Sequence, residues 1–89
     1  METAQTTKIL IVEDEELQKN VLVSLLQSDG HEVVTATNGI DAIKIIEKDN
    51  FEIIITDIIM PGADGIEVLR TSKRIDPDCD VIIIRVNSF

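Results

Sequence analysis

Three carboxylates stand out in this sequence because each follows a short apolar run. Glu13 and Asp14 come directly after the run 9–12, and Asp57 follows the run 53–55. If both runs are parallel strands, their carboxyl ends meet at one edge of the sheet, which is where open α/β sheets bind ligands. Carboxylates held close together repel one another, and a hard divalent cation such as Mg²⁺ relieves the repulsion through oxygen ligands. The sequence therefore predicts a Mg²⁺ site at Glu13, Asp14 and Asp57, although a solvated strand end would explain any one of them alone.

Four apolar runs rich in Ile and Val alternate with three segments that have helical spacing. Continuous apolar runs of this kind are typical of strands buried on both faces, as in a parallel sheet. A helix in each gap would connect successive strands by right-handed crossovers. We expect an α/β fold with a doubly wound parallel sheet, with strands over residues 8–13, 32–37, 52–57 and 80–85 and helices over residues 15–29, 39–48 and 65–75.

Residues at the ends of the three predicted helices indicate where each helix begins and ends. Asn38 and Asp64 precede the second and third helices and are suitable N-caps. Gly30 follows the first helix and favours its termination, and Pro77 closes the third. Gly65 stands where the third helix begins, and its missing side chain allows close approach of another backbone.

The first predicted helix carries apolar residues at helical spacing. Leu17, Val21 and Leu25 are four residues apart and therefore lie on one side of the helix, with Leu22 and Leu26 beside them. We expect this apolar face to pack into the core.

Length, charge and cysteine content narrow the class of protein. The 89 residues allow one domain at most, and 44% of them are hydrophobic, which is typical of a folded chain. Seventeen acidic residues against eight basic ones give a net charge of −9, which repels nucleic acid and anionic membranes, so we expect neither as a direct partner. Cys79 is the single cysteine, so an internal disulfide is excluded. Residues 1–7 lack the apolar segment of a secretory signal, and we expect a cytoplasmic protein.

Two segments around the three carboxylates resemble the receiver domain of two-component response regulators. They are residues 12–15 (VEDE) and residues 57–65 (DIIMPGADG), and residues 38–42 (NGIDA) are similar to that family's opening of the second helix. The resemblance extends in order from residue 8 to residue 84. It implies a flavodoxin-like or CheY-like three-layer αβα sandwich, in which the family's strand order is 2-1-3-4-5.

The resemblance also implies roles for individual residues. Asp57 would accept a phosphoryl group from a phosphohistidine on a sensor histidine kinase or a histidine phosphotransfer protein. Asp14 and Asp57 would bind Mg²⁺ directly, Glu13 would bind it through water, and Ile59 would contribute its backbone carbonyl. The chain would then be a signalling module in a phosphorelay and not an enzyme.

The sequence departs from the family after residue 84. A receiver normally continues through a fourth helix, a fifth strand that ends in a phosphoryl-binding lysine, and a fifth helix, and no counterpart of these is present. We therefore expect strand order 2-1-3-4 and interpret residues 1–89 as a C-terminally truncated receiver domain. Arg85 stands where the family carries its switch serine or threonine. The alternative function is therefore a switching-deficient receiver that acts only as a binding or dimerisation module.

Two other classes of protein fit these residues poorly. Hydrolases that form an aspartyl phosphate resemble a D-x-D motif whose second aspartate is the acid/base, but Ile58 and Ile59 follow Asp57 here. A flavodoxin-like nucleotide binder needs a loop of small residues after the first strand, and residues 13–16 are all acidic.

The predicted fourth strand would form an edge of the sheet. Its unpaired backbone groups are a template for pairing with another chain, and one sheet face would be covered mainly by the helix over residues 15–29. We therefore expect a homodimer, formed either through the fourth strand or by exchange of a terminal element.

Overall fold

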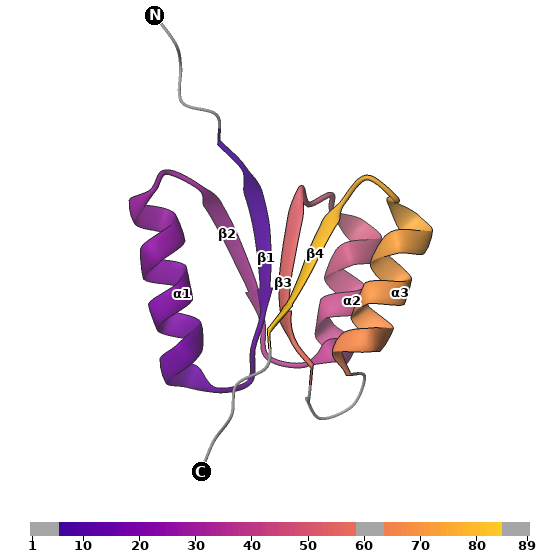
Figure 1. Cartoon of the computed structure of the whole chain (residues 1–89), viewed down its shortest axis with the longest axis horizontal. Helices are drawn as coiled ribbons and strands as arrows, with labels where there is room; N and C mark the ends of the chain where they lie inside the picture. The colour runs from indigo at the N-terminus through magenta and orange to yellow at the C-terminus, as the bar shows by residue number, and fades with distance from the viewer. Residues whose placement is uncertain (1–5, 59–63, 85–89) are drawn as a thin grey trace, which may run out of the picture.

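A parallel sheet of four strands lies between helices in the computed structural model, which describes residues 6–58 and 64–84 (Figure 1). Helix α1 lies on one face of the sheet, and α2 and α3 lie side by side on the other. The elements in chain order are β1 (Lys8–Val12), α1 (Glu16–Ser28), β2 (Glu32–Ala36), α2 (Gly39–Lys48), β3 (Ile53–Asp57), α3 (Gly65–Ile75) and β4 (Asp80–Ile84).

The strand order is β2-β1-β3-β4, and each neighbouring pair is parallel. Strands β1 and β3 are therefore the two central strands. The predicted fold class and strand order are confirmed, and the predicted ends of α2 and α3 match the structure. Strands β1, β2 and β3 are each one residue shorter than predicted, and residue 85 lies outside the described residues.

Two side chains and one glycine mark helix boundaries as predicted: the side chains cap the starts of α2 and α3, and the glycine follows α1. Asn38 accepts a hydrogen bond from the Asp41 N–H at 2.8 Å, and Asp64 accepts one from the Glu67 N–H at 3.0 Å. Each bond satisfies a backbone donor that has no partner within its helix. Gly30 follows α1 with φ of 90°, a left-handed conformation that costs glycine little.

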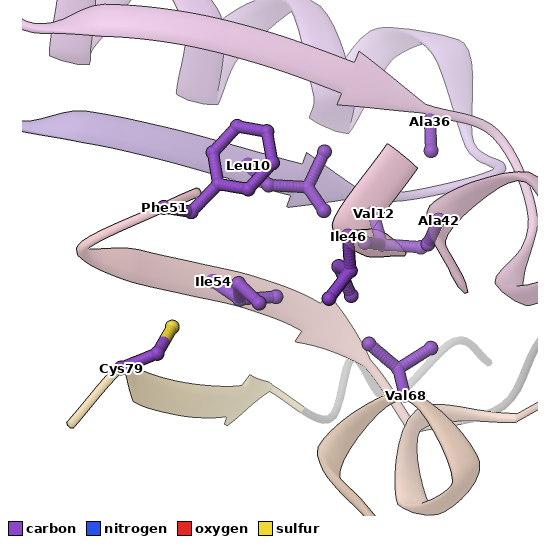
Figure 2. Packing of buried hydrophobic residues seen from close by; sticks show 9 residues of the cluster. All are labelled: Leu10, Val12, Ala36, Ala42, Ile46, Phe51, Ile54, Val68 and Cys79. Carbon is purple, nitrogen blue, oxygen red and sulfur yellow. The ribbon is translucent and has the colours of Figure 1, made fainter. Parts of the chain in front are cut away.

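The main core lies between the sheet and helices α2 and α3 (Figure 2). Alternate residues of one strand point to opposite faces, so Leu10 and Val12 enter this core while Ile9 and Ile11 are buried on the α1 side. Burial on both faces explains why β1 is apolar without alternation. The cluster consists of Leu10, Val12, Ala36, Ala42, Ile46, Phe51, Ile54, Val68 and Cys79.

Helix α1 differs from the sequence prediction. Leu17, Val21 and Leu25 are 70%, 51% and 63% exposed, so the prediction that this stripe packs into the core is wrong. The reason is that α1 packs on β1 and β2 with no described helix beside it, so only the side facing the sheet is covered. Leu17 and Val21 instead help to line a groove of about 380 Å³ that Ile84 also borders. None of the helices in the described ranges is long and apolar enough to cross a membrane.

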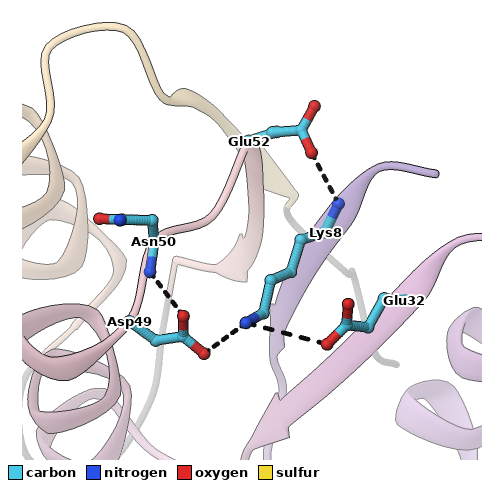
Figure 3. Close-up of polar contacts among 5 residues, drawn as sticks. All are labelled: Lys8, Glu32, Asp49, Asn50 and Glu52. Atoms are coloured by element: carbon cyan, nitrogen blue, oxygen red, sulfur yellow. Dashed lines mark hydrogen bonds and ion pairs between the residues drawn. The ribbon is translucent and has the colours of Figure 1, made fainter. Parts of the chain in front are cut away.

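Lys8 connects several elements at the amino-terminal edge of the sheet (Figure 3). Its Nζ donates to Asp49 Oδ2 at 2.6 Å, at the end of α2, and lies 3.8 Å from Glu32 Oε2 on β2. Its backbone N–H donates to Glu52 Oε1 at 3.1 Å, just before β3. Lys8 therefore ties the start of β1 to both neighbouring strands and to α2.

Candidate functional site

The register of the central strands brings the three predicted carboxylates together. Val12 of β1 is paired with Thr56 of β3, so Glu13 and Asp57 follow at the same level of the sheet. One carboxylate oxygen from each of Glu13, Asp14 and Asp57 lies within 4.8 Å of the other two. The predicted convergence at the carboxyl edge is therefore observed, whereas Ile59, the fourth predicted ligand, lies outside the described residues.

The three carboxylates differ in exposure. Glu13 is only 1% exposed, Asp57 is half-buried, and Asp14 is exposed. Glu13 Oε2 accepts the Glu15 N–H at 3.0 Å, but within the part of the chain that the structure describes no group hydrogen-bonds Glu13 Oε1. Burial raises the pKa of the Glu13 carboxyl above its ordinary value, and the charges of Asp57 and Asp14 raise it further, against the opposing effect of the Glu15 N–H.

The donor set of this cluster fits a hard divalent cation. Two ionised carboxylates at this separation repel by roughly 3–4 kcal/mol at an effective dielectric constant of about 20. Buried polar atoms normally have a partner, and Glu13 Oε1 lacks one among the described residues. Oxygen ligands from one or two carboxylates, completed by water, are what Mg²⁺ takes in proteins. Glu13, Asp14 and Asp57 therefore suit Mg²⁺ in charge, donor type and spacing.

The backbone after Asp57 is tied to two other elements. The Ile58 N–H donates to Ile84 O at 3.2 Å, at the end of β4, and the Gly65 N–H donates to Ile58 O at 3.1 Å, at the start of α3. A Cβ on Gly65 would lie 2.5 Å from Asp57 O, so the predicted close approach at this glycine is confirmed. Thr56 Oγ1 donates to Asp57 O at 3.0 Å. Sequence reasoning missed Thr56, because nothing in its position distinguishes it from another buried strand residue.

The basic residue at the start of β1 lies away from the carboxylate cluster. Lys8 lies at the opposite edge of the sheet, where it is bound to Asp49. Arg85, which stands at the position of the switch hydroxyl, lies outside the described residues.

Comparison with known proteins identifies the family of this chain. The profile of the response regulator receiver domain matches residues 9–88. The chain belongs to the response regulator receiver family. Among solved receivers, the response regulator TrrA of Thermotoga maritima, in complex with Mg²⁺-BeF, superposes with a TM-score of 0.86 at 35% identity. The match covers 93% of this chain and 72% of TrrA.

Two curated relatives show how much of a receiver the chain spans. The response regulator receiver protein CpdR of Brucella abortus is 36% identical over 77 residues, which is 86% of this chain and 64% of CpdR. Sporulation initiation phosphotransferase F of Bacillus subtilis is also 36% identical over 77 residues, and the match covers 62% of its length. The chain thus spans slightly less than two thirds of these two receiver proteins.

Proposed function

We propose that this receiver accepts a phosphoryl group on the Asp57 carboxylate from a phosphohistidine, as one step of a two-component phosphorelay. The observation that carries the proposal is the cluster of Glu13, Asp14 and Asp57 at the carboxyl ends of β1 and β3. Membership of the receiver family supports it independently. The proposed unit is a single receiver domain.

The chemistry assigns a different role to each carboxylate. An Asp57 oxygen attacks the phosphorus atom, the P–N bond of the phosphohistidine breaks, and a P–O bond forms, so that Asp57 becomes an acyl phosphate. Asp14 and Asp57 would hold Mg²⁺ directly, Glu13 would hold it through water, and Ile59 would offer its carbonyl. When bound, Mg²⁺ supplies positive charge that reduces the repulsion between the carboxylate and the phosphoryl oxygens. Glu13, which is buried, supplies the carboxyl group on the inner side of the cluster.

The partner in this proposal is a protein that carries a phosphohistidine. The TrrA receiver, at 34% identity and a TM-score of 0.83, has been solved in complex with the histidine kinase ThkA. By analogy, we expect a sensor histidine kinase or a histidine phosphotransfer protein as donor, and no nucleic acid or membrane as direct partner. The chain acts as an acceptor and not as an enzyme, in the cytoplasm.

Treatment with a small phosphodonor such as acetyl phosphate tests the function. Intact mass spectrometry is expected to detect one added phosphoryl group on the wild-type protein in the presence of Mg²⁺, and none after chelation. Asp57→Asn is expected to abolish the addition, whereas Asp29→Asn, which changes a carboxylate that is 82% exposed beyond α1, leaves it unchanged. Labelling that survives Asp57→Asn contradicts the assignment. Mg²⁺ binding without labelling would favour the alternative, a receiver that only binds partners.

We further propose that the chain forms a homodimer through β4. The Asp80 N–H donates to Glu52 O and the Ile58 N–H donates to Ile84 O, so the alternation of a parallel ladder directs the backbone groups of Val81 and Ile83 away from β3. Two copies could pair these edges around a two-fold axis. Ile82, which is 48% exposed, and the stripe on α1 supply apolar surface for such contact. Exchange of a terminal element is the other route to the same dimer.

A further inference from the structure

The peptide group between Asp57 and Ile58 is held from several directions. Thr56 Oγ1 donates a hydrogen bond to the carbonyl oxygen of this peptide, Asp57 O, and the peptide N–H, which belongs to Ile58, donates one to Ile84 O. The next carbonyl, Ile58 O, accepts the Gly65 N–H. Thr56 is completely buried, and Gly65 is buried as well, so water does not compete freely for these bonds. This peptide leaves the carboxyl end of β3 in one defined orientation.

The orientation of this peptide bears directly on the Asp57 side chain. The direction in which a side chain leaves the backbone is set by the two peptide groups that flank its Cα. The peptide before Asp57 belongs to β3, which pairs with β1 and β4. With the following peptide also fixed, the Asp57 carboxylate is directed toward Glu13 and Asp14, within the 4.8 Å that separates the three groups.

Gly65 leaves no room for displacement. A Cβ at this position would lie 2.5 Å from Asp57 O and 2.9 Å from Ile58 Cα, and both are backbone atoms that cannot rotate away. Ordinary C–H···O contacts begin at about 3.3 Å, so an added methyl group would push the two backbones apart by about 0.8 Å. A binding constellation tolerates errors of only about 0.5 Å. The displacement required therefore exceeds what the carboxylate cluster can absorb.

We propose that Thr56 and Gly65 are positioning residues for Asp57: they fix the Asp57–Ile58 peptide, Thr56 by a hydroxyl hydrogen bond and Gly65 by the absence of a side chain. They touch neither phosphoryl group nor cation. The inference rests on the proposed function for its Mg²⁺ readout. It also makes a claim about the geometry of Asp57 that holds without the cation.

Paired substitutions at Thr56 separate the hydroxyl from the packing. Thr56→Val keeps the shape and loses the hydroxyl, whereas Thr56→Ser keeps the hydroxyl and loses a methyl group. Supporting groups around metal ligands contribute about tenfold or more to metal affinity, so we expect Thr56→Val to weaken Mg²⁺ binding by about tenfold. Thr56→Ser is expected to bind Mg²⁺ more tightly than Thr56→Val. The opposite order would show that only packing matters and would overturn the role of the hydroxyl.

Gly65→Ala tests the steric part, with Val68→Ala as the matched control on the same helix. Val68 is fully buried in the main core, so its truncation lowers stability by removing packing atoms and adds no atom against the Asp57 backbone. Both variants are compared at a temperature where circular dichroism finds them folded. Gly65→Ala is expected to weaken Mg²⁺ binding by about tenfold or more, whereas Val68→Ala binds like the wild type. Equal losses in the two variants would reduce Gly65 to a structural role.

Two measurements on the metal-free protein keep the positioning claim separate from the proposed function. Amide hydrogen exchange at Ile58 is expected to be faster in Gly65→Ala than in Val68→Ala, because its bond to Ile84 O is disturbed. The ¹³C NMR signal of the Asp57 carboxyl is expected to shift in Thr56→Val and Gly65→Ala only. If the wild type binds no Mg²⁺, the proposed function fails while these signals still decide the positioning. If Mg²⁺ binds and neither signal nor affinity changes, the positioning claim fails alone.

Discussion

At the scale of single residues, burial makes the three site carboxylates unequal. Glu13 is almost completely buried beside its two neighbours, while Asp14 faces solvent, which screens its charge. Among the three carboxylates, the pair that solvent screens least is therefore Glu13 and Asp57. Burial first, and then the charges of Asp57 and Asp14, raise the pKa of Glu13, so an ionised Glu13 is a cost to the folded chain that a bound cation would reduce.

Asp57→Asn is expected to stabilise the metal-free protein. Removal of one charge from the cluster raises the free energy of unfolding by about 1–2 kcal/mol, less than the full Coulomb energy because solvent reaches Asp14. Urea denaturation with and without Mg²⁺ measures the effect. The wild type gains stability from Mg²⁺, by about 2.7 kcal/mol at one hundred times the dissociation constant, and the variant gains much less. An Asp29→Asn control is expected to change neither value, and loss of stability in metal-free Asp57→Asn would contradict a repulsive cluster.

Ser72→Ala is expected to be neutral or stabilising. Ser72 Oγ is buried on α3 beside a cavity of about 10 Å³, and among the described residues its only polar neighbour is the weakly hydrogen-bonding thiol of Cys79. Alanine removes this hydroxyl and is the better helix former, which together give about 0.5–1 kcal/mol. Ser24→Ala is the matched control, because Ser24 is exposed within α1 and reports helix propensity alone. Destabilisation of Ser72→Ala by more than about 1 kcal/mol in urea denaturation would mean that the cavity holds a bound water.

The residues of the site could be predicted from sequence to a limited extent. The convergence of Glu13, Asp14 and Asp57 follows from strand ends and parallel pairing, which the apolar runs already indicate. The burial of Glu13 does not follow, because it depends on how neighbouring segments pack in three dimensions and not on local sequence. Thr56 Oγ1 also escaped prediction, since its partner is the next residue's carbonyl and depends on local backbone geometry.

At the scale of elements, caps and periodicity predicted the positions of all three helices to within a residue, but periodicity alone gave the wrong buried side for α1. Leu17, Val21 and Leu25 recur at helical spacing, and so do Leu22 and Leu26 beside them. The helix is therefore apolar over much of its circumference. A period gives the width of an apolar stripe and not its direction. The direction is decided by what lies alongside, and of the described strands and helices α1 contacts β1 and β2.

Lys8→Met is expected to loosen the junction of β1, β2 and α2 in a pH-dependent way. Its Nζ holds the pKa of Asp49 below the ordinary value of 3.8, so the stabilisation is present above that pH and is lost as pH falls through the lowered pKa. The Asp49 contact likewise raises the pKa of Lys8 above its ordinary value of 10.5. The stabilisation is therefore also lost as pH rises through this raised pKa. We expect the melting temperature of Lys8→Met to lie furthest below that of the wild type at pH values between the lowered pKa of Asp49 and the raised pKa of Lys8. Thermal melts at a series of pH values measure this.

Lys44→Met provides the control for loss of a positive charge. Lys44 is exposed on α2 and takes part in none of the ion pairs found within residues 6–58 and 64–84. Its substitution is expected to leave the melting profile nearly parallel to that of the wild type. If Lys8→Met gives the same profile as Lys44→Met, the junction contributes no specific stabilisation.

At the scale of the whole molecule, the two faces of the sheet are covered unequally. Within residues 6–58 and 64–84, helices α2 and α3 cover one face, and α1 is the single helix on the other. Apolar exposure at Ile82 and along α1 is therefore a property of the architecture and not of one residue. The net charge of −9 opposes association, but salt screens it beyond about 8 Å, whereas the apolar contribution is unaffected.

Ile82→Lys is expected to convert the proposed dimer to a monomer. A lysine on the edge strand places charge in the apolar contact and is a common means of blocking edge pairing. Ile40→Lys is the matched control: Ile40 is 50% exposed, against 48% for Ile82, but lies on α2 on the opposite face. Light scattering at micromolar concentration measures the mass. A monomeric wild type would contradict the dimer, and dissociation by Ile40→Lys would place the interface elsewhere.

The central position of β1 also sets an order of events during synthesis. Strand β1 pairs with β2, which follows 24 residues later in the chain, but its other neighbour β3 follows 44 residues later. At about 5–20 residues per second, a ribosome needs roughly 1–4 s to make the intervening stretch. During this interval the nascent β1–α1–β2 unit has one open apolar edge, and Glu13 and Asp14 have no Asp57 to repel them. The acidic cluster is therefore completed only when β3 closes that edge, so its electrostatic cost arises last, once β3 has been made.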